Sequence, residues 1–397
     1  MDMFVHDRLT GETVRVSVDS LGMQGNDKSG LPAISADGRF VAFNSWATNL
    51  VLDDTNNSED VFVHDLQTGL TTRVSVDSAG NEGNDESGSW YSPWISPDGR
   101  YVSFESRATN LVPGDTNLAV DIFLHDRLTG ETTLESKSSS GIQGDWPSEF
   151  PSLSSDARYV AFMSRSTNLV PGDTNQDQDV FLRDRATGET TRVSVSSSGT
   201  QGNYDSWNPS ISADGQLVAF HTYATNLVPD DHNWSTDVLV HDRLTGETTR
   251  VSVDSEGREG DDVSWQPSIS ADGRYVAFSS AARNLVPGDT NADGDVFVHG
   301  PELSLHAEPE VASAGQTLTL TAYKGVPANR TSLWAVDVSG VPTFSLIGLG
   351  SFGGDGNFVV SGIVPPDLSG DTITVRGYAV AHSGFGAATN DATVTFQ

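Results

Sequence analysis

One six-residue pattern returns six times in this chain, and this regularity constrains the fold more than any other feature. The pattern is an aspartate, three apolar residues, usually a histidine and then usually a second aspartate. Its copies begin at Asp2, Asp60, Asp121, Asp179, Asp237 and Asp295, at intervals of 58, 61, 58, 58 and 58 residues. A fixed period of this size indicates one repeated supersecondary unit, in which each copy buries its apolar face against the next.

A single repeat predicts four short strands and no helix. In residues 209–253, strands are expected at 209–212, 216–220, 237–241 and 248–253, with an Asp-Gly turn between the first two. The last strand alternates in period 2, and no segment has the 3.6-residue period of an amphipathic helix. Four antiparallel strands per repeat, A to D, are typical of a β-propeller blade. We therefore predict an all-β fold with a propeller.

Two motifs resemble the repeats of TolB-like (WD40-like) propeller proteins. They are residues 267–278 and 242–250, and the Ser-Pro-Asp-Gly signature of that family stands unchanged at 96–99. The resemblance covers residues 2 to about 300. It implies the fold but not an activity, since such propellers serve as binding platforms, enzyme appendages and occasionally enzymes.

The pattern gives two possible numbers of blades. A–B hairpins begin at the five prolines Pro32, Pro93, Pro151, Pro209 and Pro267, whereas strand C occurs six times. The leading C–D pair, residues 2–18, is either the outer half of the last blade or the remnant of a sixth. The family resemblance favours six blades and leaves five open. Because the chain starts inside a repeat, we expect upstream residues in the native protein.

The period stops near residue 300, and a second domain is predicted for residues 301–397. Strands are expected at 316–322, 332–337, 357–361, 371–378 and 392–397, separated by glycine-rich turns. This spacing is typical of a small immunoglobulin- or fibronectin-like β-sandwich. The propeller is predicted to occupy residues 1–300.

Charge and composition narrow the possible partners. The chain has 54 acidic and 22 basic residues, a formal charge of −32, and no cysteine. Such a surface repels nucleic acid and anionic lipid and attracts cations, although it can also serve solubility alone. No signal peptide or membrane-spanning apolar run is visible. An extracellular or periplasmic location is inferred from the resemblance and from the calcium-type loops described next.

The strongest chemical signal lies between strands B and C, where each loop carries Asp-x-Asn-x-x-x-Asp. The copies are Asp54/Asn56/Asp60, Asp115/Asn117/Asp121, Asp173/Asn175/Asp179, Asp231/Asn233/Asp237 and Asp289/Asn291/Asp295, with an additional carboxylate at Asp177 and Asp293. Alternating oxygen ligands are typical of loops that wrap Ca²⁺. The same residues can instead cap a turn through their own backbone. We favour calcium for the two loops with the extra carboxylate and hold both interpretations open for the other three.

A second signal lies where the repeats differ from one another. The B–C and D–A loops of a propeller emerge on one face, and here they vary in aromatic and charged residues. Possible catalytic residues on that face are Glu105, Glu149, His221 and Tyr223, and possible ligand-binding residues are Trp46, Trp90, Arg107, Trp146 and Arg165. Trp207 and Trp265, two residues before a strand A proline, are interpreted as packing between blades. The recurring strand C histidines are interpreted as structural.

Three functions remain open at this point. The first is a secreted or envelope-associated, calcium-rigidified propeller that binds a carbohydrate or protein ligand through its loop face. The second is a glycoside hydrolase or polysaccharide lyase, in which aromatic plates and a carboxylate pair act at the channel mouth. The third is a purely structural cell-surface repeat protein. No nucleophile elbow, zinc-protease helix or phosphate loop is present in the sequence.

Overall fold

A computed structural model describes residues 1–88, 91–291 and 293–300, and beyond them the strands of the C-terminal region. The chain divides into two compact units, Met1–His299 and Gly300–Gln397, here called unit 1 and unit 2. The described residues contain strands and turns and no helix, which confirms the all-β prediction. None of them forms a helix with the length and apolar character needed to cross a membrane.

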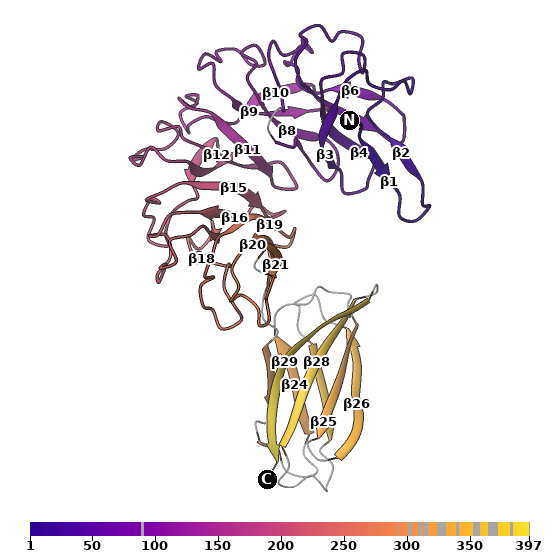
Figure 1. Ribbon diagram of the computed structural model, residues 1–397, viewed down its shortest axis with the longest axis vertical. Coiled ribbons are helices and arrows are strands. Elements are labelled where there is room, and N and C mark those ends of the chain that lie inside the picture. Colours follow the sequence, from indigo (N-terminus) through magenta and orange to yellow (C-terminus); the bar gives the residue numbers. More distant parts are fainter. Residues whose placement is uncertain are drawn as a thin grey trace. The chain divides into compact units, whose positions relative to one another are not determined.

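Unit 1 is built of antiparallel sheets with the strand order of propeller blades (Figure 1). Blades 1 to 4 are β3–β6, β7–β10, β11–β14 and β15–β18, blade 5 is β19–β21, and β1–β2 form an N-terminal hairpin. The A strands are β3 (Ser29–Ile34), β7 (Trp94–Ile95), β11 (Ser148–Leu153), β15 (Ser206–Ile211) and β19 (Ser264–Ile269). The B strands are β4 (Phe40–Ser45), β8 (Tyr101–Ser106), β12 (Tyr159–Ser164), β16 (Leu217–Thr222) and β20 (Val276–Ser280).

The outer strands complete the blades. The C strands are β1 (Phe4–His6), β5 (Asp60–Asp65), β9 (Asp121–Asp126), β13 (Asp179–Asp184), β17 (Asp237–Asp242) and β21 (Asp295–His299). The D strands are β2 (Thr13–Arg15), β6 (Thr71–Arg73), β10 (Glu131–Leu134), β14 (Glu189–Arg192) and β18 (Thr248–Arg250). The four-stranded blade predicted from one repeat is confirmed.

Apolar side chains hold each blade together and join it to the next. Strands B and C contribute stacked phenylalanines, such as Phe43 and Phe62, whose ring centroids lie 6.0 Å apart. Between blades, Val238 of strand C in blade 4 shares a buried cluster with Ile269 of strand A in blade 5. This repeated burial of apolar area is the main stabilising term for such an array.

A polar contact also repeats at the boundaries that precede blades 1 to 4. The hydroxyl of Thr132 in strand D donates to the carbonyl oxygen of Val76 in the preceding blade, at 2.5 Å. The same hydroxyl lies 2.9 Å from Nδ1 of His125 in strand C. The recurring histidine therefore has a structural role in these contacts, as the sequence indicated.

The sheets of unit 1 follow one another along an arc, and its first and last sheets lie apart (Figure 1). Repeat positions that are buried between inner blades are consequently exposed in the blades at the two ends. Ile34 at the first end is 51% exposed, and Val296 and Val298 at the last end are 76% and 66% exposed. Five A–B hairpins and a separate C–D hairpin are present, as counted from the sequence.

Unit 2 consists of two sheets, one with the order β22-β24-β27 and one with the order β23-β29-β28-β25-β26. Its strands are β22 (Ser304–Glu308), β23 (Val311–Ala312), β24 (Thr317–Tyr323), β25 (Thr331–Val338), β26 (Val341–Ser351), β27 (Phe358–Ile363), β28 (Thr372–Ala381) and β29 (Gly384–Phe396). The sequence indicated β24, β25, β27, β28 and the end of β29. It did not indicate β22, β23 or β26.

Candidate functional site

A bulge in strand A shapes the inner surface of unit 1. In blades 3, 4 and 5 the A–B register shifts just before the strand A proline, between Glu149 and Ser152 in the first of these. The residue before the proline has a positive φ: 57° at Phe150, 51° at Asn208 and 52° at Gln266. A bulge of this kind kinks the strand and redirects its side chains. The residues at the bulge therefore leave the regular alternation of the strand.

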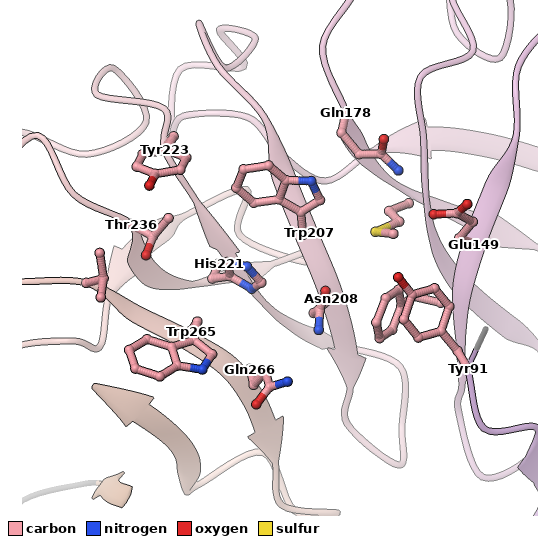
Figure 2. Close-up of a pocket in the computed structure, with 13 residues that line it drawn as sticks. Tyr91, Glu149, Gln178, Trp207, Asn208, His221, Tyr223, Thr236, Trp265 and Gln266 are labelled. Carbon is pink, nitrogen blue, oxygen red and sulfur yellow. The ribbon is translucent and has the colours of Figure 1, made fainter. Parts of the chain in front are cut away.

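These bulges line a groove of about 720 Å³. Its walls are Tyr91, Glu149, Phe150, Met163, Gln178, Trp207, Asn208, His221, Tyr223, Thr236, Val263, Trp265 and Gln266. Figure 2 shows Glu149 and Tyr91 on one side, His221 and Trp265 on the other, and Trp207 between them. The groove thus combines aromatic plates with a few amide, hydroxyl and ionisable groups.

The two ionisable groups from the A–B hairpins, Glu149 and His221, are both perturbed by burial. Burial raises the pKa of Glu149, and the guanidinium groups of Arg107 and Arg165 act in the opposite direction. Burial lowers the pKa of His221 to about 4, so its imidazole is neutral at pH 7. Its Nδ1 is buried and has no hydrogen-bond partner among the described residues. A neutral imidazole in this position offers a ligand a hydrogen-bond donor or acceptor.

Aromatic contacts hold His221 in place. Trp207 lies opposite His221 across the A–B hairpin, and their ring centroids are 5.3 Å apart. The ring of Tyr223 meets that of Trp207 edge-on at 5.7 Å. This packing limits the rotamers of all three side chains, so the groove wall is largely preformed in blade 4.

Three of the four possible catalytic residues line this groove: Glu149, His221 and Tyr223. Glu105 does not line it. It belongs to strand β8, is 2% exposed, and accepts a hydrogen bond from the backbone N–H of Tyr91 at 3.1 Å. Glu149 is therefore the one carboxylate among the residues that line the groove.

None of the possible ligand-binding residues that the structure describes belongs to the groove wall. Trp46 is half-buried beneath the ammonium of Lys28, which lies 5.0 Å from the ring centroid. Trp146 is 55% exposed. Arg107 and Arg165 are exposed but close enough to influence Glu149. Trp90 lies outside the described residues.

Sequence reasoning did not include several residues of the groove wall. Trp207 and Trp265 were interpreted as packing residues, and Asn208 and Gln266 were not singled out as groove residues. The sequence did contain a signal for the two tryptophans, which is variation between the repeats. The strand A position that they occupy holds Gly30 in blade 1 and Glu149 in blade 3. The bulge that turns them into the groove depends on a positive φ, which the sequence does not show directly.

The B–C loops use their asparagines to brace the turn. In blade 1, Oδ1 of Asn56 accepts a hydrogen bond from the N–H of Ser58 at 2.7 Å, and its Nδ2 donates to the carbonyl oxygen of Gly83 at 2.9 Å. Asn117, Asn175 and Asn233 make the same two types of contact. In blade 5, Asn291 accepts from the N–H of Asp293 and donates to Asp295.

The carboxylates of two of these loops gather with a third from further along the chain. Asp54 and Asp60 meet Glu82, and Asp231 and Asp237 meet Glu259, with ligand atoms within 4.8 Å of one another. Burial raises the pKa of Asp60 and of Asp237 to about 6. The side chain of Asp54 is 2% exposed, and its Oδ1 lies 4.0 Å from Nη1 of Arg73 but has no hydrogen-bond partner among the described residues. We call these groups the blade 1 and blade 4 carboxylate clusters.

An arginine from strand D partly neutralises each cluster. In blade 1, Nη1 of Arg73 lies 3.2 Å from Asp60 and also contacts Glu82. In blade 4, Nη1 of Arg250 lies 2.9 Å from Glu259, and its Nε lies 3.2 Å from Asp237. Three carboxylates against one guanidinium leave a formal charge of −2 in each cluster when all groups are ionised.

The other loops differ in their partners. Gln143 donates to both Asp115 and Asp121 in blade 2. Gln201 and Arg192 contact Asp173 and Asp179 in blade 3. Asp177 lies near Asp205, and burial first and Asp205 second raise its pKa. In blade 5, Asp289 and Asp295 line a separate hollow of about 610 Å³, and Asp293 is exposed.

No family model and no curated protein matches the chain. The structure of putative TolB from Agrobacterium tumefaciens matches at 14% identity and a TM-score of 0.42, over 92% of this chain and 98% of that one. A structural genomics protein of unknown function from Bacteroides thetaiotaomicron matches at 12% identity and a TM-score of 0.32, over 70% of this chain and 63% of that one.

These similarities are too low to transfer an activity or a ligand. The description of unit 1 does not depend on these comparisons. It depends on the repeated four-stranded sheets and on the Ser-Pro-Asp-Gly turn that precedes strand B. Unit 1 therefore has a propeller-like all-β fold, built of repeated antiparallel blades.

Proposed function

We propose that unit 1 is a binding module whose groove takes a carbohydrate chain. The observation that carries this proposal is the groove wall itself, which presents Trp207, Trp265, Tyr223 and Tyr91 beside amide and hydroxyl groups. The flat apolar faces of sugar rings pack against aromatic side chains, and their hydroxyl groups need donors and acceptors. An extracellular or periplasmic location, where glycans are abundant, fits this proposal.

Binding is favoured over hydrolysis by the carboxylate content of the groove. Glycoside hydrolysis ordinarily requires two carboxyl groups that flank the scissile bond. Glu149 is the one carboxylate that lines the groove among the described residues, whereas Glu105 is buried in its blade. His221 with Tyr223 is the alternative acid–base pair, and it makes a lyase the second candidate.

The groove proposal is tested by binding measurements on a panel of soluble polysaccharides, neutral (laminarin, xylan) and uronate-rich (alginate, pectin). We expect the variants W207A and W265A to lose at least tenfold in affinity for any polysaccharide that the wild type binds, because each removes an aromatic plate. The matched control is W146A, which removes a 55% exposed tryptophan outside the groove wall.

The same panel decides between the two candidate functions. Unchanged affinity in both groove variants would contradict the assignment of the groove. New reducing ends or unsaturated products from the bound polysaccharide would show catalysis, and their loss in E149Q or H221A would assign it to this groove.

We also propose that the blade 1 and blade 4 carboxylate clusters bind Ca²⁺. A formal charge of −2, a buried Asp54 oxygen without a hydrogen-bond partner and an all-oxygen donor set suit a hard divalent cation. In each cluster, two aspartates come from the B–C motif and one glutamate comes from the loop after strand D. A bound ion would therefore join these two segments of the blade. The asparagines of the motif already brace the turn and are not needed as ligands in this proposal.

The calcium proposal predicts a thermal shift that depends on two glutamates. Calcium in excess over EDTA should raise the Tm of the wild type, by a stabilisation of about 2.7 kcal/mol at a concentration of 100 times Kd. The double variant E82Q/E259Q should fold and lose most of this shift, because glutamine already occupies the equivalent positions at Gln143 and Gln201. Equal Tm values in calcium and EDTA would contradict the proposal, and an unchanged shift in the variant would contradict these two sites.

A further inference from the structure

The boundary between blades 2 and 3 breaks the repeat at three positions. Just after strand D, blades 1, 3 and 4 have valine at two places, for example Val74 and Val76 in blade 1, whereas blade 2 has Glu135 and Lys137. The third change is in strand C of blade 3, where Arg183 stands at the position of His64, His125 and His241. The three changes lie at one boundary. Together they replace two apolar side chains and a neutral one by three charged side chains.

Arg183 takes over the structural contacts of the histidine that it replaces. Its Nη1 donates to Oγ1 of Thr190 at 3.0 Å, as the histidines contact threonine elsewhere, and to the carbonyl oxygen of Gly188 at 3.0 Å. Its side chain is 9% exposed. A guanidinium is not needed for the threonine contact, since the imidazole of His125 makes it in the preceding blade.

One carboxylate in the cluster is shared between two arginines. Glu135 is 3% exposed, and its oxygens lie 3.0 Å from Nε of Arg185 and 3.5 Å from Nε of Arg183. Glu135 also accepts a hydrogen bond from the hydroxyl of Thr133 at 2.7 Å. Its capacity as an acceptor is therefore largely used within the cluster.

The positive charges outnumber this carboxylate. Arg183, Arg185 and Lys137 carry three formal charges against the single charge of Glu135, whereas the nearby Arg158 is neutralised by Asp184 at 2.8 Å. The cluster thus has a formal charge of +2 in a protein with a formal charge of −32. Among the described residues, Glu135 is the acidic group whose charge acts on the ammonium of Lys137.

A cavity accompanies this excess of positive charge. It has a volume of about 400 Å³ and is lined by Thr133, Glu135, Lys137, Arg158, Arg183 and Arg185, with Ala186. Burial lowers the pKa of Lys137 and of Arg183, so the charged form of each pays a desolvation penalty in this place. A bound anion would offset that penalty through charge-assisted hydrogen bonds.

We propose that this cationic cavity binds a small oxyanion, which is a sulfate, phosphate or carboxylate group. Guanidinium groups recognise such anions through paired N–H donors, and the lysine adds a compact charge. The anion is either a free inorganic ion or a substituent on a larger ligand. The site is independent of the carbohydrate groove: Arg158 precedes strand β12, whereas the groove residue Met163 lies near its other end.

The residues at the other boundaries between blades show which substitutions to use in the test. The triple variant E135V/K137V/R183H gives the boundary between blades 2 and 3 the residues that already pack at the other boundaries. It should therefore fold while its formal cluster charge falls. R258Q is the matched control, because it removes one positive charge from a side chain that is 72% exposed and distant in sequence.

Isothermal titration of the full chain with sulfate, phosphate and acetate, at an ionic strength fixed by potassium chloride, measures the site. We expect saturable binding of at least one anion by the wild type and by R258Q, and at least a tenfold loss of affinity in the triple variant. The single variant K137V, which keeps the Glu135–arginine contacts, should show a smaller loss. Absence of saturable binding to all three anions, or equal affinity in the triple variant, would overturn the inference.

A second arm distinguishes the two sources of the anion. Sulfated and phosphorylated oligosaccharides are compared with the inorganic ions on the same variants. Tighter binding of an oligosaccharide than of the inorganic ion, lost in the triple variant, would assign the cavity to a substituent on a larger ligand. Equal affinities would assign it to the free ion, and both results support an oxyanion site.

Discussion

At the scale of single residues, two aspartates have pKa values that are shifted in opposite directions because their surroundings differ. Asp121 is buried in strand β9, where burial raises its pKa to about 6 despite hydrogen bonds from Ser136 and Gln143. Asp65 lies at the end of strand β5, where two hydrogen bonds from Arg39 hold its pKa well below the usual range. Burial dominates for the first residue and the charged partner for the second.

This contrast predicts opposite pH effects for two conservative variants. Because the pKa of Asp121 is about 6 in the folded protein and near 3.8 when unfolded, the folded state binds more protons between these values. Asp121 therefore supports stability below pH 4, and this contribution is lost as the pH rises through 6. In calcium-free buffer, D121N should match the wild type near pH 4 and exceed it by about 1–3 kcal/mol at pH 7.

Chemical unfolding at a series of pH values checks this prediction, with D65N as the control of opposite sign. The carboxylate of Asp65 stabilises the fold at pH values above its unfolded pKa, so D65N should be less stable than the wild type at pH 7. A difference between D121N and the wild type that does not change from pH 4 to pH 7 would contradict the assignment of a raised pKa.

At the scale of elements, the sequence predicted the strands that show a clear local residue pattern. It did not predict strand segments that contain a bulge in the backbone. The strand C ranges were nearly correct, since β17 is Asp237–Asp242 and the expected strand was 237–241. Strand A was expected to start at Pro209, whereas β15 starts at Ser206. The three additional residues pass through a bulge with Asn208 at a φ of 51°, which period-2 alternation does not reveal.

The same limit explains which parts of the candidate sites were predicted. Glu149 and His221 were found because they break their own repeat, and the structure places both in one groove. Glu82 was missed because it lies 22 residues beyond Asp60 in sequence, across the C–D hairpin, so no local spacing links them. Only the pairing of strands brings this carboxylate to the B–C loop.

At the scale of the whole molecule, the repeat array of unit 1 ends in two apolar surfaces that inner blades do not have. Val63 of strand β5 is fully buried, whereas Val298, at the same repeat position in β21, is 66% exposed. Ile34 is 51% exposed, although Ile95 at the same position in the next blade is 5% exposed. The residues themselves are identical, so the difference follows from absent packing partners: a neighbouring blade at Ile34, and a strand D and a neighbouring blade at Val298.

Matched substitutions at Val63 and Val298 test whether these surfaces are open in solution. V63T places a hydroxyl in a closed core and should lower the free energy of unfolding by about 1–3 kcal/mol. V298T leaves its hydroxyl in water and should cost less than about 0.5 kcal/mol. Both values come from denaturant unfolding of the full chain at several protein concentrations. An equal cost at the two positions would mean that the face of blade 5 is covered, and a cost at Val298 that grows with protein concentration would identify a second copy as the cover.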